Sequence, residues 1–122
     1  MIMIIMVVVR HTKPMSAKDK TKLAELAQAQ NWCIVSEPEK GRFEAIDDNS
    51  LPTLAYSLAE FDVQLDFAVG DFIQVNASIN QQMVSQALNW LDVRSDENVL
   101  DLFCGIGNFS LPLARSANQV VG

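Results

Sequence analysis

The hydrophobic and polar positions divide the first third of the chain into a strand, a helix and a second strand. A short run rich in Ile and Val predicts a buried strand over residues 2–10, and residues 32–36 predict another. Between them, Ser16 is placed to cap a helix and Asn31 to end it. The helix carries an apolar stripe of Leu23, Leu26 and Ala27. This β-α-β order favours parallel pairing of the two strands.

The middle of the chain alternates between polar turns and short extended segments. A short strand is expected at 43–46, within a turn-rich stretch. Residues 61–67 alternate strictly, and one face collects Phe61, Val63, Leu65 and Phe67. This alternation predicts a half-buried strand that pairs antiparallel with the segment before it. A brief extended segment is expected at 72–75.

From Ala77 the spacing of the apolar residues changes to that of a helix. Ser78 and Gln81 resemble a capping box at its start. The predicted apolar face consists of Ile79, Met83, Val84, Ala87, Leu88 and Leu91.

The last part of the chain predicts a strand, a glycine turn and a helix. Residues 99–103 form an apolar run typical of a central parallel strand, and residues 104–108 form a tight turn. Proline is tolerated only near the first turn of a helix, so the helix that contains Pro112 should begin near Asn108. Residues 119–122 predict the start of another strand.

Composition and charge narrow the class of protein. A chain of 122 residues can bury a core, and 49% apolar with 20% charged residues is typical of a globular domain. The formal charge of −6 argues against this surface, taken alone, gripping a polyanion. The apolar start is shorter than the about 20 residues of a membrane span and has no basic leader. We expect a cytoplasmic protein.

The two cysteines and the single histidine give no sign of a metal site. Cys33 and Cys104 lie far apart, with no CxxC pair and no Cys/His cluster, and two free thiols fit a reducing compartment. Cys33 stands in a predicted strand, where a thiol acts as a small apolar side chain. His11 has no second His or Cys nearby, so we expect a surface histidine at a strand end.

The strand, glycine turn and helix at 99–114 form a candidate cradle for a nucleotide or cofactor. Gly105 and Gly107 let the backbone approach a ligand, and the helix start offers free N–H groups. Ser110 stands where a dinucleotide fingerprint needs its third glycine, and no Lys is present to grip a phosphate. Asp101 at the strand end suits a cationic or hydroxylated ligand such as S-adenosylmethionine. Other nucleotide-binding folds, and a glycine turn without a ligand, stay open at this point.

Two longer stretches carry a family resemblance. "DFIQVNASINQQMVSQALNWLDV" and the following "VLDLFCGIGNFSLPLA" closely resemble the bacterial RNA uracil-5-methyltransferases, above all those acting on 23S ribosomal RNA, with the tRNA enzymes as cousins. "VVVRHTKP" and the polar stretch before Leu51 resemble that family's central region. The resemblance implies an α/β chain whose residues 1–69 are an α+β central-domain segment. Residues 70–122 would be the first part of a Rossmann-like, S-adenosylmethionine-dependent methyltransferase domain.

The resemblance also implies which residues bind the cofactor, namely Gln74, Asp101, Phe103, Gly105, Gly107 and Asn108. Gly105 and Gly107 would carry the turn over the methionine part of S-adenosylmethionine, and Phe72 would face the substrate side. Ordinary packing and hydrogen bonding are the alternative roles of the two aromatic residues and of the glutamine. Cys104 is then neither nucleophile nor metal ligand, but a small residue at the mouth of the turn.

The family's mechanism implies groups that this sequence is not expected to contain. In the family, a cysteine thiolate adds to C6 of an extruded uracil, C5 takes the methyl group, and a base removes the C5 proton. The resemblance implies that this cysteine, the base and an acidic residue for the cofactor ribose follow Gly122. We therefore expect no catalytic residue here, and an inactive internal fragment. The parent protein would also carry an N-terminal oligonucleotide-binding domain and a 4Fe-4S cluster outside this chain.

The resemblance makes 23S ribosomal RNA the partner of the parent protein, with no membrane involved. An unpaired sheet edge and uncovered apolar faces lead us to expect that the fragment associates with itself. Two alternatives stay open: a tRNA uridine-5-methyltransferase, and a non-enzymatic nucleotide-binding or interaction module that uses a glycine turn.

Overall fold

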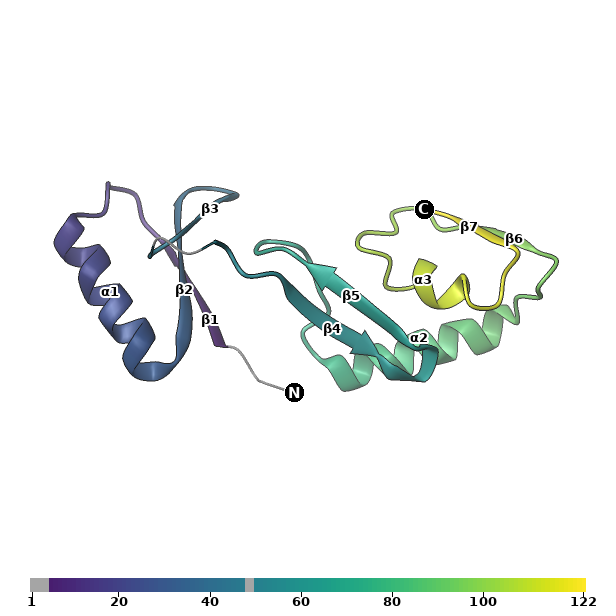
Figure 1. Ribbon diagram of the computed structural model, residues 1–122. Helices are drawn as coiled ribbons and strands as arrows, with labels where there is room; N and C mark the ends of the chain where they lie inside the picture. The colour runs from purple at the N-terminus through teal and green to yellow at the C-terminus, as the bar shows by residue number, and fades with distance from the viewer. Residues whose placement is uncertain (1–4, 48–49) are drawn as a thin grey trace. The chain divides into compact units, whose positions relative to one another are not determined.

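The computed structural model describes residues 5–47 and 50–122, and the chain is mixed α/β, as predicted (Figure 1). It divides into two compact units, Met1–Pro52 and Thr53–Gly122, called unit 1 and unit 2 below. The predicted boundary between residues 69 and 70 concerns the domains of the family and stays a prediction. No helix in the described part of the chain is long and apolar enough to cross a membrane.

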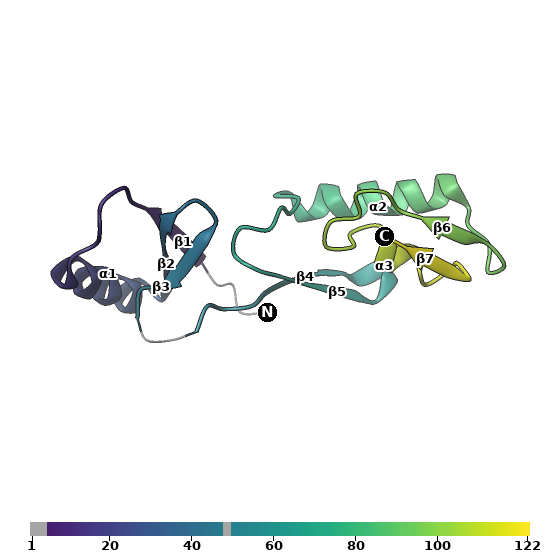
Figure 2. The ribbon, with the colours of Figure 1, turned by 90° about the horizontal axis from the view of Figure 1, so that it is seen from above.

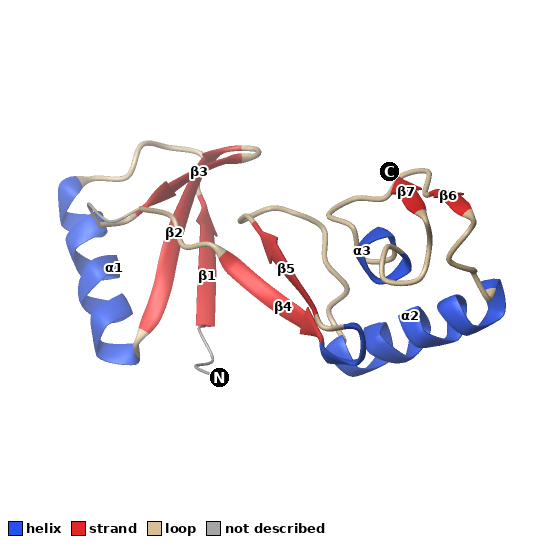
Figure 3. Cartoon of the chain, turned by 45° about the vertical axis from the view of Figure 1, so that its right-hand side comes forward, coloured by secondary structure: helices blue, strands red, loops and turns tan. Residues whose placement is uncertain are grey.

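Unit 1 is a three-stranded sheet with a helix packed on it. Its elements are β1 (Ile5–Arg10), α1 (Ala17–Gln30), β2 (Trp32–Glu39) and β3 (Arg42–Ala45). The predicted β-α-β order is confirmed, because β1 and β2 pair in parallel, whereas residues 2–4 of the first predicted strand lie outside the described residues. β3 pairs antiparallel with β2, which makes β2 the central strand. In Figure 3, α1 lies along the sheet formed by these strands.

Both ends of α1 follow from its sequence. Ser16 Oγ accepts the Asp19 N–H at 3.2 Å, and the Asp19 carboxylate accepts the Ser16 N–H at 3.3 Å, which completes a capping box. Asn31 ends the helix in the left-handed conformation, with φ 54°. Leu26 of the predicted apolar stripe is 42% exposed, because α1 packs on β2 through half-buried positions only.

Unit 2 combines a hairpin, a long helix and a small β-α-β unit. Its elements are β4 (Leu54–Leu58), a 3₁₀ turn (Ala59–Phe61), β5 (Val63–Phe67), α2 (Ala77–Leu91), β6 (Asn98–Leu100), α3 (Ser110–Leu113) and β7 (Gln119–Val121). β4 and β5 pair antiparallel as predicted, although β5 begins at Val63 because Phe61 belongs to the 3₁₀ turn. β6 and β7 pair in parallel around α3, which confirms the strand predicted at the end of the chain.

The core of unit 2 lies between the hairpin and α2, which runs beside it in Figure 2. The buried core residues are Leu58, Val63, Leu65 and Val84. Ile106 and Phe109, which flank the second glycine of the predicted cradle, are packed against this cluster. The glycine turn is therefore anchored in the core by its apolar residues.

The start of α2 differs from the prediction. Asn76 is the N-cap, and its Oδ1 accepts the Ile79 N–H at 3.0 Å. The predicted capping box of Ser78 and Gln81 is wrong, because the helix begins two residues earlier and the extended Asn76 caps its first turn. Residues 72–75 are in no strand.

The predicted strand at 99–103 is shorter than its apolar run. β6 ends at Leu100 because the turn begins at Asp101, and Leu100 is 65% exposed. Its predicted burial is wrong, since β6 has β7 as its one paired strand among the described residues. α3 begins at Ser110, two residues after the start predicted near Asn108, and Pro112 lies in its first turn, where proline is tolerated.

Candidate functional site

The turn between β6 and α3, residues 101–109, uses backbone conformations that favour glycine. Phe103 has φ 63°, Gly105 φ 58° and Gly107 φ 94°. A Cβ at Gly107 would lie 3.1 Å from Leu111 Cγ, so this glycine allows close packing on α3. A Cβ at Gly105 would meet nothing within 4 Å. The backbone of Gly105 therefore borders open space and is accessible to a ligand.

A hydrogen bond between two side chains closes the base of the turn. Ser110 Oγ donates to Asp101 Oδ2 at 2.6 Å, and the Asp101 N–H donates to the Val121 carbonyl at 2.8 Å. The structure gives no hydrogen bond from a described residue to the other carboxylate oxygen of Asp101. Residues 101–113 contain no Lys or Arg. This arrangement suits amino or hydroxyl groups on a ligand and disfavours phosphate.

Apolar side chains are exposed at the tip of the turn and in the segment before α2. Phe103 is fully exposed and Leu102 is 69% exposed. Phe72 and Val75, in the segment 71–76, are also more than four-fifths exposed. A residue other than glycine in the left-handed conformation costs roughly 1–2 kcal/mol. Packing within unit 2 is therefore not the role of Phe72 or Phe103, and both are available to a ligand or partner.

Asn108 is held by two other elements of unit 2. Tyr56 Oη donates to Asn108 Oδ1 at 2.8 Å, and Asn80 Nδ2 donates to the same oxygen at 2.9 Å. Asn108 Nδ2 donates in return to Asn80 Oδ1 at 2.8 Å. Burial raises the pKa of Tyr56, which keeps the phenol protonated as a donor. Sequence reasoning missed Tyr56 and Asn80, although Asn80 lies one helical repeat before the buried Val84 and its polarity was a signal.

Gln74 forms no hydrogen bond with the turn in this structure. It is exposed in the segment that leads into α2, and no hydrogen bond joins it to a described residue. Five of the six predicted cofactor residues therefore lie together on one turn: Asp101, Phe103, Gly105, Gly107 and Asn108.

Cys104 has a packing role. It is half-buried, and its Sγ lies 3.6 Å from the Gly105 carbonyl oxygen. A Cβ at Gly122 would lie 2.8 Å from Cys104 Cβ and 3.0 Å from Ser110 Oγ. The end of β7 thus approaches the turn so closely that Gly122 and a small residue at position 104 are needed together.

Cys33 is also half-buried, and burial, aided by the negative charge of Asp47, raises the pKa of its thiol. A thiol with a raised pKa is a poor nucleophile at neutral pH. Within residues 5–47 and 50–122, no group of three or more His, Cys, Asp or Glu side chains is placed to hold a metal ion.

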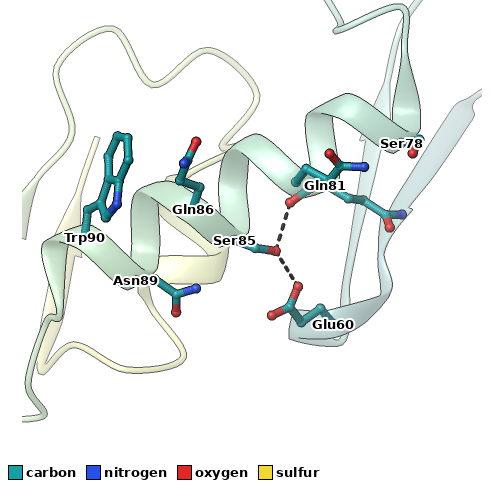
Figure 4. Close-up of a pocket in the computed structure, with 8 residues that line it drawn as sticks. Glu60, Ser78, Gln81, Ser85, Gln86, Asn89 and Trp90 are labelled. Atoms are coloured by element: carbon teal, nitrogen blue, oxygen red, sulfur yellow. Dashed lines mark hydrogen bonds between the residues drawn. The ribbon is translucent and has the colours of Figure 1, made fainter.

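A hollow of about 630 Å³ lies on the outer side of α2, away from the predicted residues (Figure 4). Amide and hydroxyl side chains of α2 line it, with Trp90 at one end and Glu60 at its edge. Ser85 donates to the Glu60 carboxylate, and Gln81 Nε2 donates to the Ser57 carbonyl at 3.2 Å. These bonds tie α2 to the hairpin, and no predicted cofactor residue lines the hollow.

In unit 1, two hollows share the loop His11–Met15 between β1 and α1. The His11 ring bridges this loop to β2, with Nδ1 2.7 Å from the Lys13 carbonyl oxygen and Nε2 3.1 Å from Ser36 Oγ. Because a carbonyl only accepts, Nδ1 carries the proton. Five cationic side chains line one or the other hollow: Arg10, Lys13, Lys20, Lys22 and Arg42.

The acidic groups beside these hollows are already engaged. Glu37 accepts two hydrogen bonds from Arg10, at 2.9 and 2.8 Å, and a third from the Gly41 N–H at 2.9 Å. The Arg10 hydrogen bonds hold the pKa of Glu37 below its usual range, and the bonds to Ser16 lower the pKa of Asp19. Lys13, Lys20 and Lys22 form no salt bridge with a described residue, although the charge of Lys22 interacts with the carboxylate of Asp19.

The sequence of the chain places it in a family of RNA-modifying enzymes. A family model described as tRNA (Uracil-5-)-methyltransferase matches residues 2–122, so the chain belongs to this family, as the sequence predicted. A Pseudoalteromonas translucida protein named 23S rRNA (uracil(1939)-C(5))-methyltransferase RlmD is 49% identical over 95% of this chain and 26% of its own length.

Proteins of the same name from two further bacteria show a similar level of identity. The Xanthomonas campestris protein is 47% identical over 93% of this chain and 26% of its own length. The Pseudomonas fluorescens protein is 47% identical over 94% of this chain and 24% of its own length. The chain therefore spans about a quarter of the length of the curated relatives it matches.

Proposed function

We propose that this chain is part of an S-adenosylmethionine-dependent methyltransferase that methylates C5 of a uridine in 23S ribosomal RNA. The observation that carries the proposal is the 49% identity, over 95% of the chain, to a relative named for that reaction. The position in the relatives' name, uridine 1939, is the first one to test.

The residues of the turn fit S-adenosylmethionine, which supplies a methyl group bound to a positively charged sulfur. Gly105 offers accessible backbone, and Asp101 offers a carboxylate oxygen that accepts no hydrogen bond from a described residue. In this proposal Gly107 and Asn108 shape the turn, while Phe103 and Gln74 complete the site from its tip and from the segment before α2. β6 and β7 are then the first two strands of a Rossmann-like sheet, which binds ligands beyond the carboxyl ends of its strands.

Neither cysteine of this chain is the nucleophile in the proposed reaction. Cys33 lies in unit 1 with a raised pKa, and Cys104 packs against Gly122. We assign the catalytic cysteine, the base, the acid for the cofactor ribose and the 4Fe-4S cluster to the rest of the full-length protein. The 122 residues alone are then inactive and, because no further described strand pairs with the edges of the β6–β7 sheet, self-associating.

The distribution of charge supports an RNA-binding role for unit 1. Seven of the nine Lys and Arg residues precede Thr53, where seven acids balance them, whereas unit 2 has a formal charge of −6. Lys13, Lys20 and Lys22 surround the loop after β1 without salt bridges to described residues. Unpaired cations of this kind bind phosphates and release counterions. The rRNA backbone therefore docks on this loop.

Methyl transfer by the full-length protein tests the proposal. The protein is incubated with tritium-labelled S-adenosylmethionine and either a 23S rRNA fragment spanning uridine 1939, the same fragment with cytidine at that position, or tRNA. We expect label at C5 of uridine in the first substrate alone. Label in tRNA with none in the rRNA fragment would favour the alternative function, a tRNA uridine-5-methyltransferase, which agrees with the description of the family model. No transfer to any uridine by the folded protein would contradict both.

A further inference from the structure

The buried face of α2 begins with a polar residue. Val84 is fully buried, Leu88 is packed against the core, and Asn80, one helical repeat before Val84, is 3% exposed. An apolar side chain would fit this stripe with no hydrogen bonds to satisfy. Burying an amide is unfavourable unless its groups are paired, so Asn80 is explained by what it binds.

The partner of Asn80 is the glycine turn. Two reciprocal hydrogen bonds join its amide to that of Asn108, and Tyr56 of β4 adds a third. Asn108 Oδ1 thus accepts two hydrogen bonds, which is the full capacity of a carbonyl oxygen. Nδ2 keeps one N–H. Asn108 therefore has little left to offer a ligand, and most of its amide is used within unit 2.

The hydrogen bonds to Asn108 fix the orientation of the turn, which apolar packing alone leaves free. Ile106 and Phe109 hold the turn against the core, but packing between apolar groups is non-directional. Asn108 directly follows Gly107, which has φ 94°. The backbone of a glycine rotates freely because it has no Cβ. Three directional hydrogen bonds to Asn108 restrict that freedom from two elements, α2 and β4.

We propose that Asn80 and Tyr56 are positioning residues for the methyl donor, which hold Asn108 and thereby orient the backbone of Gly105 and Gly107 for binding. The inference rests on the proposed function for the identity of the ligand. In this inference, the main role of Asn108 is to shape the site. Asn80 on α2 and Tyr56 on β4 support the turn from outside it.

The test uses the full-length protein and three variants. Asn80→Ala removes two hydrogen bonds, and Tyr56→Phe removes one while keeping the ring in the core. Asn89→Ala is the matched control, because Asn89 is an exposed Asn on the same helix. The measurements are the Kd for S-adenosylmethionine by calorimetry, kcat and KM, and hydrogen exchange of the Gly107 and Leu111 amides without ligand.

We expect Tyr56→Phe to raise the Kd about fivefold and Asn80→Ala at least tenfold, as loss of one and two hydrogen bonds suggests. Exchange at Gly107 should become faster, kcat at saturation should stay within about twofold, and Asn89→Ala should match wild type. Folded Tyr56→Phe with wild-type Kd and exchange would overturn the inference, even if Asn80→Ala failed to fold. Absence of cofactor binding by the wild-type protein would overturn the proposed function itself.

Discussion

The two units contain the same β-α-β motif but use its first loop differently. In unit 1, the loop after β1 leads into a 14-residue helix and is lined by cations. In unit 2, the loop after β6 leads into a four-residue helix and carries glycines, a carboxylate and exposed apolar residues. Both loops follow the carboxyl end of a parallel strand, where α/β folds bind ligands. Under the proposed function, the comparison teaches that the shared backbone arrangement sets where each site lies and the loop residues set its ligand.

The two units also differ in their content of charged residues. Unit 1 balances seven cations with seven acids, and several of those acids are occupied by Arg10, by Arg42 or by a helix cap. Unit 2 has two cations and eight acids. RNA phosphates and a cationic methyl donor are thus expected at opposite ends of the sequence, and each prediction below challenges or sharpens this division.

The largest effect is expected in the core of unit 2. Leu58 is 1% exposed, and Leu58→Ala should lower the free energy of unfolding of unit 2 by about 2–5 kcal/mol. Each unit has one tryptophan, Trp32 or Trp90, so urea unfolding of the 122-residue chain can follow each unit by fluorescence. The Trp90 transition should shift and the Trp32 transition should not. Equal shifts of both would show that the units unfold as one.

Substitution of two glycines with similar φ values distinguishes the stability cost of backbone strain from the cost of disturbed packing. Gly41 in unit 1 has φ 80° with open space around it, and Gly107 has φ 94° with Leu111 at its back. Gly41→Ala should cost its unit about 1 kcal/mol through the backbone alone. Gly107→Ala should cost about 2 kcal/mol, because Leu111 must also move. Urea midpoints from the two tryptophans measure both, and equal losses would remove the packing role of Gly107.

We expect the lysines that line the hollows beside the loop after β1 to contribute to RNA binding, and the lysines outside both hollows to contribute much less. Lys13→Gln with Lys20→Gln should weaken binding of the full-length protein to the 23S rRNA fragment about tenfold and reduce the salt slope by about 2. Lys18→Gln with Lys40→Gln removes the same charge from positions outside both hollows and should have a much smaller effect. Fluorescence anisotropy across a salt series gives both quantities. Equal losses of RNA affinity in the two double variants would show that binding depends on the overall charge of unit 1 and not on the cations of this loop.

The smallest effect concerns the acid stability of unit 1. The pKa of Glu37 is lowered by its hydrogen bonds to Arg10 and Gly41. The stability it contributes is therefore present above the ordinary carboxyl pKa of about 4.3 and is lost as pH falls through the lowered value. Glu37→Gln should make the Trp32 urea midpoint less sensitive to acid. An unchanged pH profile would show that the ion pair contributes nothing to unit 1.

Local signals predicted much of the fold, and long-range contacts explain what they missed. Ser16 predicted the start of α1, and Asn31 its end, because caps act over three or four residues. Tyr56 and Asn80 were missed because they meet Asn108 across 52 and 28 positions.

The length of the strand at the "VLDLF" run was mispredicted for a different reason. A continuous apolar run predicts one extended strand, but β6 ends at Leu100 and the left-handed Phe103 turns the chain away from the strand direction. The same departure places Phe103 in solvent beside the predicted cofactor residues. The glycine turn could be located from sequence, whereas the network behind it required the fold.

Hydrogen exchange of the full-length protein, followed by mass spectrometry, tests the division between the units most directly. S-adenosylmethionine should protect peptides that cover residues 99–113 and leave residues 10–22 unchanged. The 23S rRNA fragment should protect residues 10–22. Protection of 10–22 by S-adenosylmethionine without protection of 99–113, or no protection of 10–22 by the rRNA fragment, would contradict the account.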